Sequence, residues 1–125
     1  MKKIFFMILA AVLMLITPAL ATDFEQISVT SSPAVGFTAT KISHSGAFQP
    51  YAQLAMCTLL GGPILFTTDG TTPTTSASGV GHTMNVGDVL HIWGYADIAK
   101  FLAIAVSTTG VLSCSYYYAL SAGVF

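Results

Sequence analysis

The chain has 125 residues, of which 54% are hydrophobic and only 7% charged, so it fits one folded domain and excludes a disordered polar tail. Its four basic residues are all lysines, and the formal net charge is −1 at pH 7. A protein that follows a nucleic-acid backbone needs clustered Lys and Arg to neutralise phosphates. The composition therefore argues against nucleic acid as a partner.

Residues 1–21 are predicted to be a secretory signal peptide. Two lysines near the N-terminus precede an apolar run over 4–16, and Ala19 and Ala21 form the A-x-A pattern of a cleavage site. A transmembrane anchor needs about 20 apolar residues, and this run is shorter. We therefore expect cleavage near Ala21 and a mature chain, 22–125, that has no membrane anchor. Its expected location is secreted, periplasmic or at the cell surface.

The 22–125 segment reads as strands separated by turns. Stretches of strand length recur between turn signals such as Gly61-Gly62-Pro63 and Ser78-Gly79. About seven strands are predicted, over 26–30, 35–42, 52–60, 63–68, 88–95, 101–107 and 111–118. This spacing is typical of an all-β protein, a single antiparallel β-sandwich of immunoglobulin-like type. The exception is 95–101, where we expect one short helical turn with Asp97 as its cap.

Cys57 and Cys114 are the two cysteines of the chain, and export would place them in a compartment where thiols oxidise. Alternation puts Cys114 on the same strand face as Leu112 and Tyr116. Cys57 is predicted to lie opposite the more apolar face of its own strand. That face holds Leu54, Met56 and Leu60. The sequence leaves two alternatives open, a Cys57–Cys114 disulfide or two buried free thiols. Neither cysteine has the spacing of a metal site.

Several predicted strands are apolar on both faces. On the 88–95 strand Leu90 and Ile92 form the better core face, so His91, Trp93 and Tyr95 are predicted to point outward as a candidate binding face. A sandwich usually exposes the outer face of each sheet to water. Apolar residues there indicate that the outer surface is covered, and we expect other subunits to cover it.

The most specific local motif is the run Phe-Thr-Thr-Asp-Gly-Thr-Thr-Pro-Thr at 66–74. We interpret it as a turn in which the Asp69 carboxylate accepts from the backbone N–H two residues later, Gly70 adopts positive φ, and Pro73 ends the strand ladder. A metal-binding or acid role for Asp69 would need a second carboxylate nearby in the sequence, and the motif supplies none.

At this motif the chain resembles two groups of proteins. The run from 66 to 74 is similar to the signature of the small sandwich modules at the C-terminus of chitobiase and hexosaminidase enzymes, which are accessory rather than catalytic. More of the chain, roughly 27–118, is similar to short virion-associated proteins of tailed phages. In those proteins the same turn precedes three further features, here Gly87-Asp88, the Ile-x-x-Phe-x-Ala-Ile strand at 98–104 and the Gly-x-Leu strand at 110–116.

The resemblance implies a β-sandwich fold, because its motifs are turn and packing positions. The predicted signal peptide departs from the phage pattern, since a virion subunit normally assembles in the cytoplasm. It favours an exported relative or a reused module.

Catalytic motifs do not accompany this pattern. His44, His82 and His91 belong to no H-E-x-x-H or other ligand spacing, and the chain contains no G-x-S-x-G elbow. We therefore expect a protein that is not an enzyme and that uses no metal and no cofactor.

Two functions remain. The first is a structural or interaction subunit that assembles with itself or with other proteins, favoured by the low charge, the two-faced apolar strands and the run Tyr116-Tyr117-Tyr118. The alternative is a carbohydrate-binding accessory module, favoured by Trp93 and Tyr95 with His91, because sugars stack on exposed aromatic rings. The expected partners are thus protein subunits or a polysaccharide.

Overall fold

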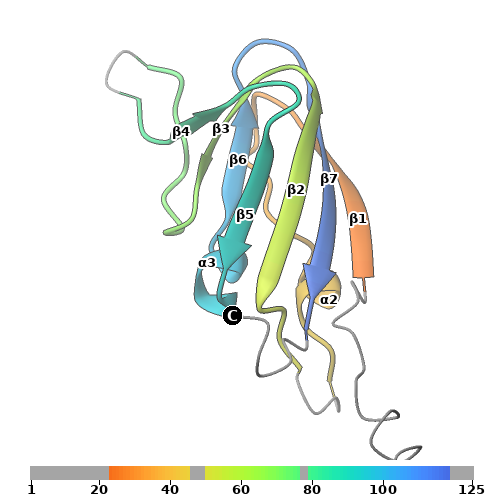
Figure 1. The fold of residues 1–125 in the computed structure, drawn as a ribbon. Coiled ribbons are helices and arrows are strands. Elements are labelled where there is room, and N and C mark those ends of the chain that lie inside the picture. The colour runs from red at the N-terminus through yellow and green to blue at the C-terminus, as the bar shows by residue number, and fades with distance from the viewer. Residues whose placement is uncertain (1–22, 46–49, 77–78, 119–125) are drawn as a thin grey trace, which may run out of the picture.

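The structure, a computed structural model, describes residues 23–45, 50–76 and 79–118 (Figure 1). In these residues seven strands form two antiparallel sheets, one in the order β1-β7-β2-β5 and one in the order β4-β3-β6. The strands are β1 (Asp23–Val29), β2 (Leu54–Gly61), β3 (Ile64–Thr67), β4 (His82–Met84), β5 (Val89–Trp93), β6 (Leu102–Ala105) and β7 (Gly110–Tyr117). Two short helices, α2 (Ala39–Ile42) and α3 (Tyr95–Ala99), lie at one end. The predicted all-β sandwich is confirmed.

The predicted signal peptide, 1–21, lies outside the described residues. Across the part of the chain that is described, no helix has the length and apolar character needed to cross a membrane.

The strand order differs in one respect from that of immunoglobulin constant domains. There the last strand joins the third and sixth strands in one sheet. Here β7 lies between β1 and β2, so that Cys114 is opposite Glu25 on one side and Cys57 on the other. The architecture is therefore an antiparallel β-sandwich of seven strands whose order differs from that of an immunoglobulin constant domain.

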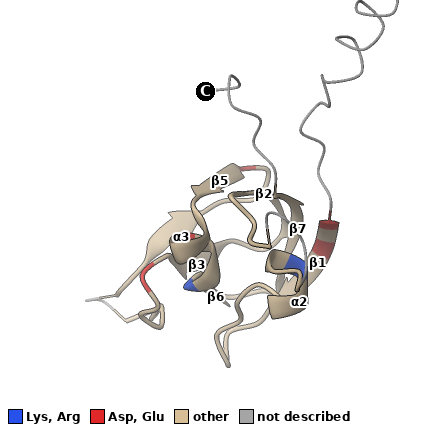
Figure 2. Cartoon of the chain, turned by 90° about the horizontal axis from the view of Figure 1, so that it is seen from below, with Lys and Arg blue, Asp and Glu red and all other residues tan. Residues whose placement is uncertain are grey.

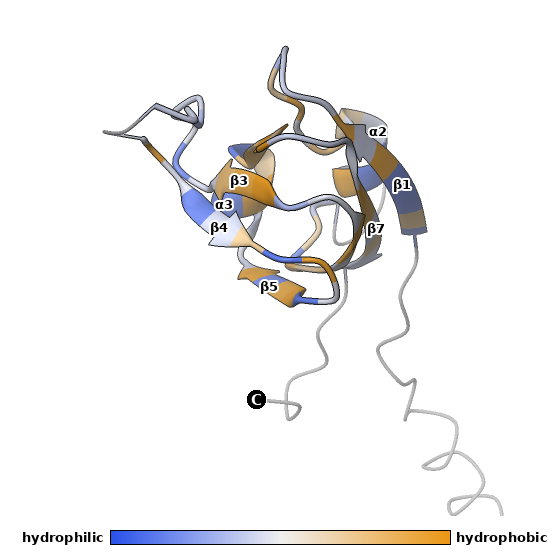
Figure 3. Cartoon of the chain, turned by 90° about the horizontal axis from the view of Figure 1, so that it is seen from above, coloured by the Kyte–Doolittle hydropathy of each residue, from blue (hydrophilic) through white to orange (hydrophobic). Residues whose placement is uncertain are grey.

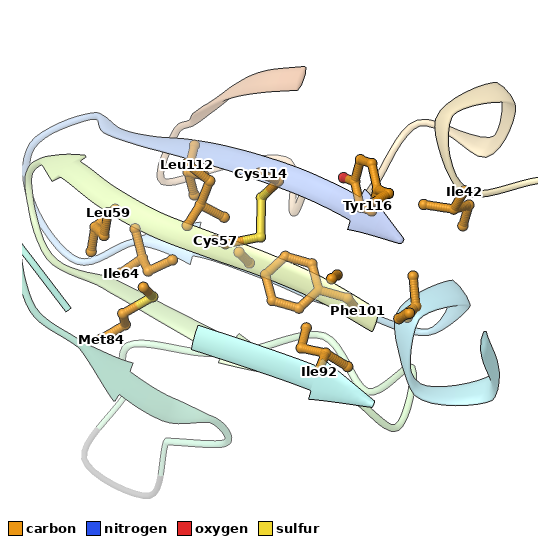
Figure 4. Close-up of a cluster of buried hydrophobic side chains, with 14 of the residues drawn as sticks. Ile42, Cys57, Leu59, Ile64, Met84, Ile92, Phe101, Leu112, Cys114 and Tyr116 are labelled. Carbon is orange, nitrogen blue, oxygen red and sulfur yellow. A yellow bond between two sulfur atoms is a disulfide. The ribbon is translucent and has the colours of Figure 1, made fainter. Parts of the chain in front are cut away.

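Cys57 and Cys114 form a disulfide with an S–S distance of 2.07 Å between the neighbouring strands β2 and β7. Both residues are buried, on the inner face of the sheet (Figure 4). On β2 the inward residues are Ala55, Cys57 and Leu59, so Cys57 lies opposite the face of Leu54, Met56 and Leu60, as predicted. Leu54, Met56 and Leu60 lie on the outer face.

The inward side chains of β2 are small enough to leave room for the large aromatic rings of the core. Phe101 is almost fully buried and stacks on Phe37 with ring centroids 4.2 Å apart, and Phe37 in turn meets Tyr116 edge-on at 5.4 Å. Figure 4 shows the Phe101 ring in the middle of this cluster. A core this rich in aromatic volume needs small residues opposite it to pack without strain.

The segment 35–42 was predicted as a strand, and this was wrong. Only Val35 makes a β contact, as an isolated bridge to Ala103 of β6, and the chain then forms α2 from Ala39 to Ile42. A second difference is β4, a three-residue strand that was not predicted.

The predicted helical turn near 95 is present as α3. Its N-cap is Gly94, with φ of +85°, and no side chain caps the helix. Asp97 lies in the first turn and is not the cap, so that part of the prediction was wrong.

Candidate functional site

The outer face of the four-stranded sheet brings the predicted binding residues together with others from three more strands. Inward and outward side chains alternate along each strand, and the register aligns outward residues across the sheet. The residues of this outer face are Phe24, Gln26, Ser28, Val111, Ser113, Ser115, Tyr117, Leu54, Met56, Thr58, Leu60, Val89, His91 and Trp93. None of these residues is Asp, Glu, Lys or Arg.

The charges of the domain lie elsewhere. Figure 2 shows β2 and β7 without charged residues, while acidic residues mark β1 and the loops, and a lysine marks α2. Asp23 and Glu25 of β1 are on the inward side of that strand, opposite Tyr116 and Cys114. The outer face is therefore an uncharged surface.

The outer face mixes exposed apolar side chains with hydroxyl groups. Phe24 on β1 is 75% exposed, and Val89 and Trp93 on β5 are 53% and 50% exposed. Between them Thr58 of β2 is paired with Ser113 of β7. Figure 3 shows that β5 of this sheet and β3 of the other sheet consist largely of hydrophobic residues. Such a surface offers both apolar contact and hydrogen-bonding groups without a fixed charge.

Two of the three predicted binding residues lie on the outer face and one does not. His91 and Trp93 point outward from β5, as predicted. Tyr95 was assigned wrongly, because the chain turns at Gly94 and Tyr95 begins α3. Its ring lies 4.4 Å from that of Tyr51 and packs partly against the core. The alternation of a strand ends where the strand ends, so it could not place Tyr95.

The loop that follows β3 has the predicted turn chemistry. The Asp69 carboxylate accepts the Thr71 N–H at 2.9 Å, and Gly70 has φ of +88°. This backbone hydrogen bond, with a smaller effect from Lys100, lowers the pKa of Asp69. The Thr67 hydroxyl donates to the Thr71 carbonyl, and Pro73 is fully buried.

Asp69 also lines a shallow pocket of about 200 Å³. The residues around it are Thr67, Thr68, Asp69, Val80, Gly81 and His82. Asp69 is the single carboxylate among them, so the pocket lacks the pair of carboxyl groups that glycoside hydrolysis requires. The turn role is thus the one that the local geometry supports.

A cluster of polar side chains between α2 and β1 was not predicted. Lys41 Nζ donates to Asp23 Oδ1 at 2.8 Å, and His44 Nε2 lies 3.5 Å from Asp23 Oδ2. The hydrogen bond from Lys41 is the largest cause that lowers the pKa of Asp23. The Tyr118 hydroxyl donates to the Lys41 carbonyl, and burial raises the pKa of Tyr118 to about 12.

Glu25 completes this cluster from the same strand. Its Oε1 accepts both the Tyr116 hydroxyl and the Thr38 N–H, the latter at 3.1 Å. Burial, and then the bond to Glu25, raises the pKa of Tyr116, which therefore stays a neutral donor. These contacts hold α2, and Thr38 just before it, against β1 and β7. We assign them a structural role.

Among the described residues, no group of three or more His, Cys, Asp or Glu side chains is placed to hold a metal ion. Comparison of the chain with protein families, curated proteins and solved structures finds no match. The resemblance to phage virion-associated proteins and to chitobiase modules accordingly stays a prediction.

Proposed function

We propose that this protein is an exported, non-catalytic structural or interaction subunit that assembles with other protein chains through the outer face. The uncharged outer face is the observation that supports this most directly. Interface cores are depleted in charged residues and enriched in aromatic residues and Met. The outer face combines Phe24, Met56, Tyr117 and Trp93 in that way. Exposed aromatic and aliphatic side chains on an uncharged face favour an interaction site.

The disulfide supports the exported location in this proposal. Structural disulfides persist in oxidising compartments and are rare in cytosolic proteins. Cys57 and Cys114 are buried on the core face, where a bridge stabilises the fold and takes no part in surface chemistry.

Carbohydrate binding is the alternative, and one feature of the outer face favours it. The register sets Tyr117, Leu54 and Trp93 in one row across three strands. Neighbouring strands are about 4.8 Å apart, so the two aromatic residues are separated by roughly 10 Å. Ser115 and His91 of the next row supply hydrogen-bonding groups beside them. A flat polysaccharide chain could stack on such a row.

Substitution of Trp93 separates the two functions. If the outer face mediates assembly, Trp93→Ala should lower the mass of the mature protein in solution, because Trp is enriched among interface hot spots, whose truncation costs about 2 kcal/mol or more. If it binds glycan, the same variant should keep its mass and lose retention on an insoluble polysaccharide. Trp93 is half exposed, so the variant is expected to stay folded, which circular dichroism would verify.

Val106 provides a matched control. It is 43% exposed and follows β6 of the other sheet, so Val106→Ala removes exposed apolar surface away from the outer face. This control should change neither mass nor retention. A wild-type protein that is a monomer at high concentration and does not bind polysaccharide would count against both functions.

A further inference from the structure

β5 is an edge strand whose outer backbone groups can be identified. In the described residues it pairs with β2 alone. The Gly94 N–H donates to the Gln53 carbonyl at 2.8 Å, and the Leu59 N–H donates to the Asp88 carbonyl at 3.2 Å. In an antiparallel pair, the residues that exchange hydrogen bonds alternate with residues that do not.

The register therefore assigns Leu90 and Ile92 to the ladder with β2. The N–H and C=O groups of Val89 and His91 point away from β2, toward the open edge. These two residues thus present two donors and two acceptors that no described strand uses.

The other three sheet edges each carry a feature that prevents pairing with another chain. β1 bears two carboxylates, Asp23 and Glu25, on its inward side. The β6 edge is covered, because Val35 and Ala103 exchange two backbone hydrogen bonds and Ala105 N–H donates to the Thr30 carbonyl. β4 has only three residues. Inward charges, a covering segment and short length are recognised protections of edge strands.

β5 has none of these protections. Its sequence, Val-Leu-His-Ile-Trp, contains no Lys, no Pro and no acidic residue. The nearest charge is Asp88, whose carboxylate accepts the Asn85 N–H at 2.8 Å and so is turned into its own loop. An open, uncharged edge of this kind is a template for another strand.

We propose that β5 pairs in antiparallel orientation with β5 of a second copy of this chain, joining two four-stranded sheets into one continuous sheet. This inference rests on the proposed function, and it names a second copy of the chain as the protein partner. Around a two-fold axis at Leu90, the Val89 groups of each copy meet the His91 groups of the other, which gives four backbone hydrogen bonds. The side chains brought opposite one another are uncharged, so a second copy meets no like-charge repulsion. The neutral outer face then continues across both copies.

A proline at position 91 tests this pairing. The His91 N–H points away from β2, so His91→Pro removes no hydrogen bond inside the domain, and proline is tolerated at that kind of edge position. His91→Thr is the matched control, because it removes the imidazole and keeps the N–H. Sedimentation equilibrium should show a dimer for the wild type and for His91→Thr. For His91→Pro it should show weaker association, with a Kd for the dimer at least about ten-fold higher than that of the wild type.

Amide hydrogen exchange of the wild-type protein gives an independent measurement in case His91→Pro fails to fold. The amides of Val89 and His91 should become protected as the protein concentration rises, while those of Leu90 and Ile92 should be protected at every concentration.

The outcomes separate this inference from the function on which it rests. An oligomer that His91→Pro leaves intact, with no added protection at Val89 and His91, would overturn edge pairing and leave assembly through the outer face standing. A wild-type protein that is a monomer at all concentrations would overturn both edge pairing and self-assembly through the outer face, and would limit the proposed function to other protein partners.

Discussion

At the scale of single residues, the contacts that the sequence predicts are those between near neighbours in the chain. Asp69 and Thr71 are two residues apart, and the turn chemistry of Asp-Gly brings them together in any context. The Tyr116–Glu25 hydrogen bond joins residues 91 positions apart, and no local pattern indicates it. Predicting such a contact requires the strand order, because β1 and β7 must first be known as neighbours.

The Asp69 turn leads to a first prediction. Asp69→Asn keeps an acceptor for the Thr71 N–H and should leave the melting temperature nearly unchanged, whereas Asp69→Ala should lower it. Gly70→Ala should destabilise the protein by about 1–2 kcal/mol, because φ of +88° is unfavourable for a residue with a Cβ. Urea unfolding would measure these differences. Added Ca²⁺ should have no effect, and a calcium-dependent rise in melting temperature that Asp69→Asn abolishes would disprove the turn-only role.

At the scale of elements, α2 shows how tertiary contacts override local preference. The β-branched and aromatic residues of 35–42 favour a strand. In the fold, Lys41 binds Asp23 and Tyr118, and Thr38 N–H binds Glu25, so the segment is held against β1 as one helical turn. A helix of four residues would not persist in isolation. Its stability comes from these contacts, which the local sequence does not contain.

Which face of β2 is buried has a different cause. Both faces of the strand are apolar, and the more apolar one holds Leu54, Met56 and Leu60. The face with the smaller residues is the buried one, because Phe101 and Tyr116 occupy the space next to it. Alternation thus predicts which residues share a face, while the volume of distant side chains decides which face is buried. β4 was missed because three residues are too few to show a period.

The attachment of α2 leads to a second prediction, on pH dependence. Lys41 lowers the pKa of Asp23 below its ordinary value of 3.8, so the folded protein binds that proton less tightly than the unfolded chain. The stabilising contribution is complete above the unfolded value and is lost as the pH falls through the folded value. The difference in melting temperature between wild type and Asp23→Asn should therefore shrink in acid.

Thermal scans between about pH 6 and pH 2 would measure this difference, because the window spans the ordinary titration of Asp. Lys41→Gln should show the same trend, since it removes the partner that lowers the pKa of Asp23. A difference between wild type and Asp23→Asn that stays constant across this range would contradict the assignment.

At the scale of the whole molecule, the sequence predicted the fold class and six of the seven strands, but not their order. Turn signals divide the chain, and alternation within the pieces indicates a sandwich. Strands that are apolar on both faces carry little information about their neighbours, which is why the place of β7 between β1 and β2 could not be predicted. The same two-faced apolarity yields the neutral outer face once the order is known. The charged residues lie instead where their side chains accept or donate hydrogen bonds that hold α2 and the turns in place.

The last prediction joins export to the disulfide. Produced with its first 21 residues, the protein should be recovered outside the cytoplasm with Thr22 as its N-terminus, because the A-x-A pattern ends at Ala21. Cys57 and Cys114 should then be bridged. The bridge closes a loop with a sequence separation of 57, and its stabilising effect is about 4 kcal/mol on the chain-entropy account.

Produced without those residues in a reducing cytoplasm, the protein should keep free thiols and unfold at lower denaturant concentration. Intact mass, with and without thiol alkylation, would measure both processing and the bridge. Ala21→Leu should impair cleavage because the site requires a small residue there, whereas Leu20→Ile, at the variable middle position of the pattern, should not. Recovery of the wild-type protein with Met1 retained in a membrane fraction would refute the predicted processing, and a mature protein with two reactive thiols would refute the link between export and the bridge.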